Sequence, residues 1–347
     1  MTERMIEHFS HQITYQVVTP LYVNHRSLTI REKLDNQLLG GRLLRDSVLN
    51  FEPDIIYSDV AVHAIQTKLI SSVIRGRIPL IVHLRGDWWT EYSAWFARAS
   101  WRRRAVSTQL YLYNWTALAL AKEVTPVCRW LERVVNHHLP ITRTEVVYAG
   151  VDPNQFHLGY GMKMDGPSVA IVQNHTVYPK VSGLLGFREV VKNLPNVQFY
   201  VAEGELAGQQ FLQMVKQHYD GLPNIHFVGG VTSGRAVRDM LAGADCYVLA
   251  SGLDCCPTTV LEASLLCKPV ICSRVGGVPE LVLENRTGWT IQNNDVNEWT
   301  TKIGLVLSDT RLARRLGQQG RAWVSERFGW KTIASQVEKL LIRESRH

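Results

Sequence analysis

The second half of the sequence alternates between short apolar runs and longer helix-favouring segments, a pattern that few folds can accept. Five such runs begin 21 to 29 residues apart: SVAIVQN (168–174), VQFYVAEG (197–204), IHFVGGV (225–231), CYVLAS (246–251) and PVICSRV (269–275). Runs that are apolar throughout are typical of parallel strands, because helices cover both faces of such a sheet. The spacing fits repeated strand–helix units. The sequence therefore predicts a doubly wound α/β domain.

The first half also has an α/β pattern, although a less regular one. Its candidate strands are residues 13–18, 54–59, 79–84 and 145–150, with a helix expected over 61–75. The length of 347 residues is enough for two domains that each bury a core. A segment rich in Gly, Pro and Asp, 150–167, is the expected linker. We therefore expect one Rossmann-like domain over 1–155 and a second over 156–329.

The C-terminal segment after Phe328 is predicted to form one amphipathic helix. Its apolar residues Ile333, Val337, Leu340 and Leu341 fall on a single helical stripe. Such a stripe indicates that one side of the helix is buried against another part of the protein.

Composition places the chain among ordinary globular proteins, since 46% of its residues are hydrophobic and 20% are charged. No stretch approaches the roughly 18 apolar residues of a membrane helix, and the N-terminus lacks the apolar core of a secretory signal. We therefore expect a cytoplasmic protein whose six cysteines are reduced. These cysteines form no zinc-type clusters with histidines, so the sequence predicts no metal site.

The most informative segment is SGLDCCPTTVLEAS, residues 251–264, which follows a predicted buried strand. A helix is expected to begin near Thr258 or Thr259, at the carboxyl edge of the sheet, where α/β folds bind ligands. The free N–H groups and positive dipole end of such a helix suit a phosphate group. Asp254 and Glu262 flank that position, and carboxylates accept hydrogen bonds from sugar hydroxyls. Thr259 and Glu262 also match a capping box, in which the glutamate only satisfies a backbone N–H.

The segment from Asp254 to Ala263 resembles the motif of family 4 glycosyltransferases, in which two acidic residues are separated by seven others. Four more segments are similar to motifs of that family: VYAGVDPNQF (147–156), KPVICSRVGGVPELV (268–282), NRTGWTI (285–291) and FGWKTIASQ (328–336). The resemblance implies a GT-B fold, in which two Rossmann-like domains face one another across a cleft. It also implies that the C-terminal helix, 330–347, packs back on the first domain.

Resemblance to this family also implies a reaction. A retaining glycosyltransferase moves a hexose from a nucleotide-diphosphate sugar, here UDP- or GDP-linked, to a hydroxyl of a glycan or lipid-linked acceptor. By position, Glu262 would hold the nucleotide ribose and Asp254 would contact the donor sugar. The backbone around Cys256, Pro257 and Thr258 would receive the diphosphate. The resemblance implies no cofactor and no required metal.

Two positions depart from the family pattern. Asp254 stands where the family usually has glutamate, and Asn174 stands where it usually has an arginine six residues before the diphosphate-binding lysine, here Lys180. Loss of that arginine removes a positive charge that would stabilise the leaving group. Gly230 and Val231 follow another strand, near the place where the family binds the nucleobase. The departures leave open a catalytically weak or inactive nucleotide-sugar-binding protein.

Four residues near the end of the strand predicted over 79–84 are expected to face the cleft and to bind the acceptor: His83, Arg85, Asp87 and Trp88. Arg85 is also a candidate for the missing positive charge, which would make it catalytic together with Lys180 and Asp254. Two alternatives remain open. His83 would be a packed core histidine, and Arg85 with Asp87 would form an ordinary ion pair.

Basic residues concentrate in the first half, where residues 1–150 hold 18 Lys and Arg against 13 Asp and Glu. The remainder holds 20 against 18. Six of the ten tryptophans fall between 88 and 130, interleaved with Arg98 and the basic run 102–104. Aromatic and basic residues together favour peripheral contact of the region Trp88 to Arg104 with an anionic membrane. The alternatives are single-stranded nucleic acid, which we do not expect, and a solvated helix face over buried tryptophans.

Overall fold

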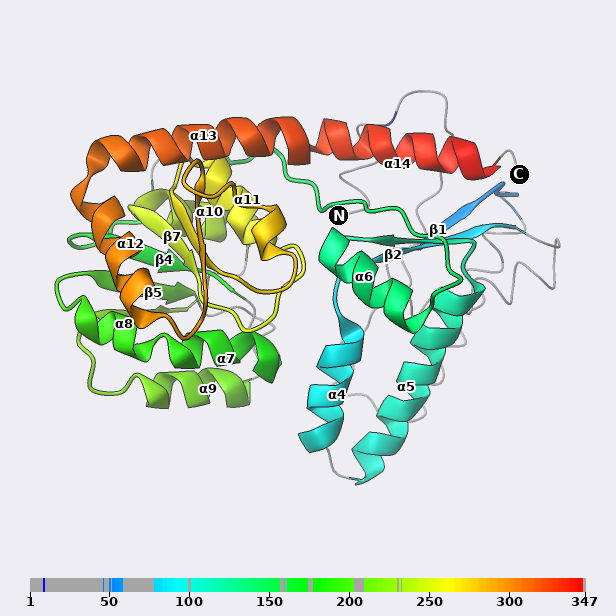
Figure 1. Cartoon of the computed structure of the whole chain (residues 1–347), viewed down its shortest axis with the longest axis horizontal. Helices are drawn as coiled ribbons and strands as arrows, with labels where there is room; N and C mark the ends of the chain where they lie inside the picture. The colour runs from blue at the N-terminus through cyan, green and yellow to red at the C-terminus, as the bar shows by residue number, and fades with distance from the viewer. Residues whose placement is uncertain are drawn as a thin grey trace.

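The computed structural model describes residues 9, 46, 50, 52–58, 78–98, 101–156, 159, 161–173, 177–202, 209–229, 231 and 233–345. The predicted strand 13–18, the predicted helix 61–75, Asn174 and Gly230 lie outside these residues. Within them the chain forms two parallel sheets that are packed with helices (Figure 1). The α/β fold expected from the sequence is confirmed.

The second sheet has the strand order β6-β5-β4-β7-β8-β9, and each neighbouring pair is parallel. Its strands are β4 (Ser168–Ile171), β5 (Gln198–Ala202), β6 (Ile225–Val228), β7 (Cys246–Leu249), β8 (Val270–Ser273) and β9 (Gly288–Ile291). The first five were predicted, whereas β9 was not, because GWTI is short and begins with a glycine. The chain order reverses at β4, which lies between β5 and β7, so ligands are expected at the carboxyl ends of β4 and β7.

Helices cover both faces of this sheet because successive strand residues point to opposite sides. Val169 and Ile171 belong to one apolar cluster, and Ala170 belongs to the other. The first cluster includes side chains of α7 (Tyr178–Gly186), α8 (Arg188–Asn193), α9 (Gln209–His218) and α12 (Val296–Ser308). The second includes side chains of α10 (Gly234–Gly243), α11 (Thr258–Leu265) and α13 (Thr310–Phe328). This two-sided burial explains why the strands are apolar throughout.

The first sheet has the order β1-β2-β3, again with parallel pairs. Its strands are β1 (Ile56–Ser58), β2 (Leu80–Leu84) and β3 (Glu123–Pro126), and its helices are α4 (Trp88–Arg98), α5 (Trp101–Leu120) and α6 (Arg129–His138). The strands predicted over 54–59 and 79–84 are confirmed. No described helix of the chain is both long and apolar enough to span a membrane.

The strand predicted over 145–150 is wrong, and the real third strand is β3. The segment does run beside β3, since Glu145 N donates to Val124 O at 3.2 Å and Val147 N donates to Pro126 O at 3.0 Å. Pro126 has no N–H to donate in return, so a regular ladder cannot continue there. Residues 145–150 therefore form an extended segment without strand pairing.

The C-terminal helix α14 (Trp330–Ser345) lies against the first sheet, and α13 and α14 together run along both sheets (Figure 1). The predicted stripe is buried, and it packs with Ile81 of β2 and Val147. The chain crosses from one sheet to the other twice, and the two crossing segments form hydrogen bonds with each other. Val151 N donates to Phe328 O at 2.9 Å, and Trp330 N donates to Val151 O at 3.1 Å. Any side chain at Gly150 would collide with the ring of Trp330.

Candidate functional site

Two helices begin at the carboxyl ends of the adjacent strands β4 and β7. α11 begins at Thr258, as predicted, and its N-cap residue is Pro257, with no side chain bonded to its free N–H groups. α7 begins at Tyr178, and its N-cap residue Val177 also has no capping side chain. Two helix N-termini therefore present free N–H groups near one point of the sheet, which favours an anion there.

The capping-box alternative for Glu262 is wrong. Thr259 occupies the second position of α11 rather than the N-cap, and its hydroxyl lies 2.8 Å from the hydroxyl of Tyr247. Pro257, at the N-cap, has no backbone N–H that a glutamate could satisfy. Glu262 lies half-buried one turn into the helix. Its carboxylate is placed where a ligand at the start of α11 could use it.

Lys180, in the first turn of α7, joins the two domains. Its Nζ lies 3.7 Å from Oε1 of Glu91, a residue of α4 in the first domain. Its backbone O accepts a hydrogen bond from Gly252 N at 3.3 Å, which ties α7 to the loop that carries Asp254. Side chains at Gly252 would collide with Pro179, so this close approach requires glycine.

The charges at this point are coupled. Burial lowers the pKa of Lys180, but Asp254 and Glu91 together raise it by more, so the pKa lies above its usual 10.5 and the side chain stays cationic at neutral pH. Burial raises the pKa of Asp254, against the opposing effect of Lys180. Burial likewise raises the pKa of Glu91. Lys180 thus interacts electrostatically with one carboxylate from each domain, and its side chain is only 20% exposed. Such an arrangement is typical of a functional site.

The loop that carries Asp254 is supported by the turn after β8. Gly277 N donates to Asp254 O at 3.0 Å, and Gly276 adopts a φ of 52°. A side chain on either glycine would collide with the backbone of Asp254 or Cys255. The glycine pair is therefore needed for close packing of two backbones, beside the Lys180 site.

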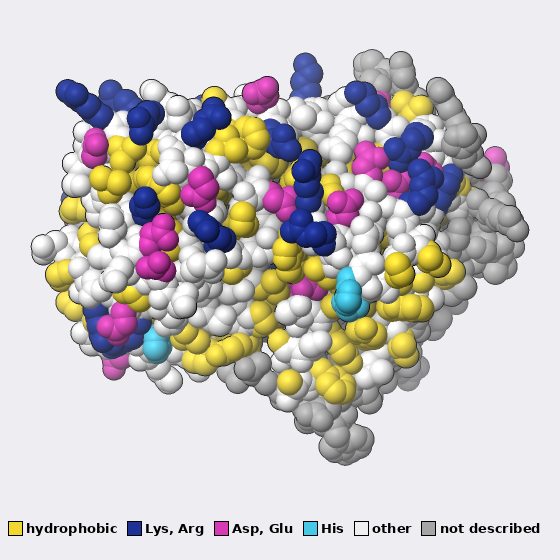
Figure 2. Space-filling view, in the orientation of Figure 1, with side chains coloured by type: hydrophobic (Ala, Val, Ile, Leu, Met, Phe, Trp, Pro, Cys, Tyr) yellow, Lys and Arg dark blue, Asp and Glu magenta, His cyan; other side chains and the backbone are white. Residues whose placement is uncertain are grey.

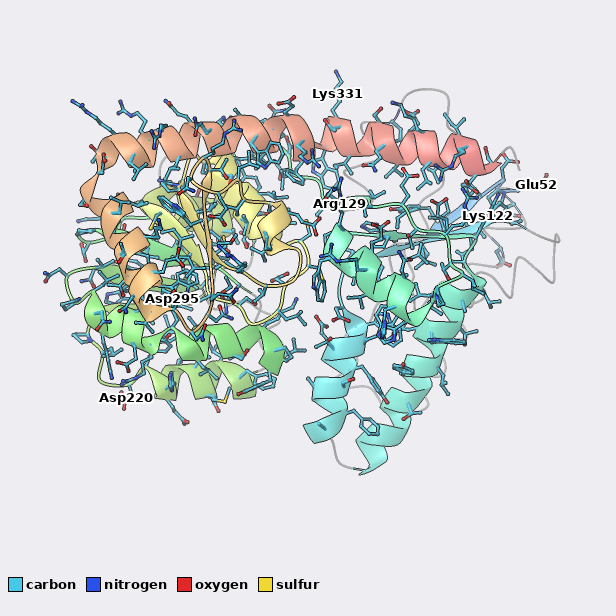
Figure 3. All side chains as sticks on the ribbon, viewed as in Figure 1. Glu52, Lys122, Arg129, Asp220, Asp295 and Lys331 are labelled. Atoms are coloured by element: carbon cyan, nitrogen blue, oxygen red, sulfur yellow. The ribbon has the colours of Figure 1, made fainter. Side chains whose placement is uncertain are left out.

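Two carboxylates that sequence reasoning missed also lie at the domain boundary. Glu91 is one. The other is Glu280, in the short helix η1 (Val278–Glu280), which accepts hydrogen bonds from Arg129 N at 2.9 Å, Trp130 N at 2.8 Å and the Tyr148 hydroxyl at 2.8 Å. Figure 3 labels Arg129 at the start of α6, between the two sheets. Glu280 thus caps a helix of the other domain, a long-range contact that no local sequence signal indicates.

The residues predicted to bind an acceptor lie in different environments in the structure. Arg85 is exposed directly after β2, and Trp88 is half-buried and stacks on Trp89 at 4.6 Å. Asp87 is buried and caps α4, since Thr90 N donates to its Oδ1 at 3.1 Å. Helix capping therefore accounts for the buried position of Asp87 without an ion pair to Arg85.

His83 is buried within β2, and its Nδ1 lies 3.1 Å from the hydroxyl of Thr125 on β3. Its ring stacks on Tyr57 at 6.1 Å. This environment favours the core-histidine alternative over acceptor binding, because the strand places the ring inside the first domain.

Two predicted donor-binding positions have different structural roles. The Cys256 side chain packs between an apolar cluster of the first domain and one of the second, and burial raises the pKa of its thiol. The backbone of Cys256 nevertheless leads directly into α11. Val231 is buried in the core beside α10, so its side chain supports the fold. Among the described residues, no group of three or more His, Cys, Asp or Glu side chains could hold a metal ion.

Comparison with known proteins shows what the chain is similar to. Residues 180–323 match the family model "Glycosyl transferases group 1". A GDP-mannose-dependent alpha-(1-6)-phosphatidylinositol monomannoside mannosyltransferase of Mycolicibacterium smegmatis is 28% identical over 279 residues, 70% of this chain and 71% of that protein. Over less than half of its length the chain thus matches a glycosyltransferase family, in agreement with the resemblance seen in its sequence.

Further proteins are similar to this chain in sequence or in structure. The N-acetyl-alpha-D-glucosaminyl L-malate synthase of Bacillus anthracis is 27% identical over 199 residues, and the match spans about half of that protein, 50%. Among solved structures, sucrose-phosphate synthase from Thermosynechococcus elongatus superposes with a TM-score of 0.71 at 19% identity, covering 91% of this chain and 80% of that one. Anabaena HepE, solved with UDP and glucose, gives a TM-score of 0.67 at 20% identity, covering 87% and 81%. The GT-B fold implied by the sequence is confirmed.

Proposed function

We propose that this glycosyltransferase transfers a hexose from a nucleotide-diphosphate sugar to an acceptor hydroxyl with retention at the anomeric carbon. One observation carries the proposal: the uncapped start of α11 lies beside Lys180 and Asp254 at the switch point of the second sheet. Free N–H groups and a buried cation are the groups that stabilise a leaving diphosphate. Glu262, one turn into α11, would accept hydrogen bonds from ribose hydroxyls.

The steps of the proposed reaction follow from the charges at this site. The acceptor oxygen attacks the anomeric carbon while the bond from that carbon to the diphosphate breaks, and the bonding electrons leave with the diphosphate. The hydroxyl proton passes to the departing phosphate oxygen. Lys180 and the α11 N-terminus balance the negative charge as it develops. Because Glu91 already pairs with Lys180, a bound diphosphate competes with Glu91 for that cation.

The name of one relative suggests which substrates to test first. The mycolicibacterial relative is named for GDP-mannose as donor and for a phosphatidylinositol monomannoside as acceptor. We therefore propose GDP-mannose as the first donor, UDP-sugars as the second, and a lipid-linked glycan as the acceptor class. The test is a transfer assay with each donor, followed by assignment of the anomeric configuration of the product by NMR. Binding without transfer would favour the catalytically inactive alternative, and an inverted product would contradict the mechanism.

Glu262→Gln tests the ribose contact. The change keeps the shape of the side chain but replaces a charged acceptor by a neutral amide. The affinity for nucleoside diphosphates should fall about 10- to 100-fold, because hydrogen bonds to charged groups are worth about 1.5–3 kcal/mol. Calorimetric titration gives the affinity, and the melting temperature should stay near that of the wild type. Unchanged affinity together with a loss of stability would show that Glu262 serves the fold alone.

We further propose that α5 brings the acceptor side of the protein to an anionic membrane. Leu112 and Trp115, one turn apart on α5, expose 57% and 42% of their surface. Figure 2 shows hydrophobic side chains gathered over this part of the first domain. Apolar residues near the basic run 102–104 fit the interface of anionic lipids.

Replacing Leu112 and Trp115 together by serine should lower binding to anionic vesicles about 10- to 100-fold, since each side chain contributes about 1.5–3 kcal/mol when fully buried and only about half of each remains exposed for the membrane to bury. Co-sedimentation with phosphatidylglycerol vesicles measures the change. Leu305→Ser, at another exposed leucine (39% exposed) in the second domain, is the matched control. Equal loss in both proteins, or none in either, would count against a membrane-facing α5.

A further inference from the structure

The side chain of Gln173 is buried, and within the described part of the chain it has no hydrogen-bond partner. Gln173 lies two residues beyond the end of β4, and only 8% of its surface is exposed. Neither its Oε1 nor its Nε2 has a hydrogen-bond partner among the residues that the structure describes. Most buried polar side chains in proteins are hydrogen-bonded, because an unmade bond is unfavourable. An amide with both ends unmatched therefore points to a ligand.

Two other amides of this domain, the buried Asn224 and the half-buried Gln198, have hydrogen-bond partners, which distinguishes Gln173 from them. Asn224 is 4% exposed, and its Nδ2 donates to the carbonyls of Val191, Leu194 and Val197 at 3.0–3.1 Å. Gln198, at the start of β5, pairs its Oε1 with the His226 ring at 2.7 Å. The packing that satisfies these amides supplies no partner for Gln173.

The position of Gln173 links it to the start of α11. The carbonyl of the preceding residue, Val172, accepts a hydrogen bond from the Tyr247 hydroxyl at 2.9 Å. The same hydroxyl lies 2.8 Å from Thr259 in the first turn of α11. Gln173 thus lies in the segment that leaves β4 beside α11 and leads to α7, whose first turn carries Lys180. Both helix N-termini there lack a capping side chain.

We infer that Gln173 binds the nucleotide-diphosphate sugar: its amide N–H donates to a diphosphate oxygen, and its amide oxygen accepts from a hydroxyl of the donor. The inference rests on the proposed function, and it adds a residue that the sequence did not single out. A neutral amide fits this place because the two N–H groups and the carbonyl can match a ligand that offers both acceptors and donors. The contact is made with the bound donor, so it should act on affinity more than on turnover.

The test uses the full chain with Gln173→Met, which is similar in length but cannot hydrogen-bond. The dissociation constants of GDP and UDP are measured by calorimetry, and the melting temperature is measured without nucleotide. The affinity should fall roughly 10- to 100-fold, because the lost contacts include a hydrogen bond to the charged diphosphate, worth about 1.5–3 kcal/mol. The melting temperature should stay level or rise, because an unsatisfied buried amide is removed. Gln173→Glu keeps the shape and brings a carboxylate to the diphosphate, so its affinity should fall further.

Gln198→Met is the matched control, because that amide already has a partner. It should lower the melting temperature and leave nucleotide affinity unchanged. If Gln173→Met binds nucleotide as well as the wild type does, or loses affinity only with a loss of stability like that of Gln198→Met, the inference is overturned. Failure of the wild-type protein to bind any nucleoside diphosphate would instead overturn the proposed function.

Discussion

Replacing Lys180 by alanine is expected to lower the kcat of transfer by about 10²- to 10³-fold, the usual effect of removing one stabilising group from a developing oxyanion. The side chain is 20% exposed and lies between a carboxylate of each domain. Its pKa is raised, so it is cationic over the whole neutral range and its charge is available at every practical assay pH. Steady-state kinetics with saturating donor measure the change.

The control for Lys180 is Lys192→Ala. Lys192 lies in the same domain and pairs with Glu189 at 2.7 Å, but both side chains are exposed. Its loss should leave kcat unchanged, since exposed ion pairs contribute little. Lys180→Arg keeps the charge but changes its geometry, so it should recover only part of the activity. Wild-type turnover by Lys180→Ala would place the diphosphate elsewhere.

Replacing Glu344 by alanine is expected to lower the free energy of unfolding by about 3 kcal/mol. Glu344 lies near the end of α14, and its side chain is only 1% exposed. Its carboxylate lies 3.0 Å from Lys122, 3.5 Å from Arg143 and 2.8 Å from Arg343. Figure 3 labels Lys122 close to the C-terminal end of α14. Removal of the carboxylate takes a shared counter-ion away from Lys122 and Arg143, whereas Arg343 still pairs with Glu123 and Glu145 at 2.7 Å each.

Denaturant unfolding measures this change, and pH gives an independent check. Burial raises the pKa of Glu344, but hydrogen bonds from Lys122 and Arg343 lower it by more, so the pKa lies below its usual 4.5. A lowered pKa means that the carboxylate stabilises the fold above about pH 4.5 and that this contribution disappears as the pH falls further. Glu344→Gln should therefore lose less stability on acidification than the wild type. A wild-type acid response in that variant would show that the cluster contributes nothing.

The second domain could be predicted from sequence because its strands are buried on both faces. β4, β7 and β8 are buried at every position and β5 at all but its first, so burial leaves a nearly continuous apolar signal. The start of α11 at Thr258 was predictable for a related reason, since Pro257 favours a helix boundary. The first domain gave a weaker signal. β3 is the short run EVTP, while the more apolar segment 145–150 cannot pair regularly beside Pro126.

The site was predictable only in its local parts. Asp254, Glu262 and Lys180 belong to motifs within one domain, and the structure brings Lys180 and Asp254 together. Glu91 and Glu280 each act on a residue of the other domain, nearly ninety or more positions away in sequence. Their local patterns are those of ordinary helix-start carboxylates, which are favourable at any helix N-terminus. Only the packing of the two domains gives them their partners.

The most direct test of the diphosphate site is calorimetric titration of the wild-type protein with GDP, UDP and the corresponding sugar nucleotides. At least one nucleoside diphosphate should bind at a single site, and Lys180→Ala should weaken that binding while Lys192→Ala should not. If none of these ligands binds the wild type at millimolar concentration, or if Lys180→Ala binds them unchanged, the start of α11 is not a site for a nucleotide-sugar donor.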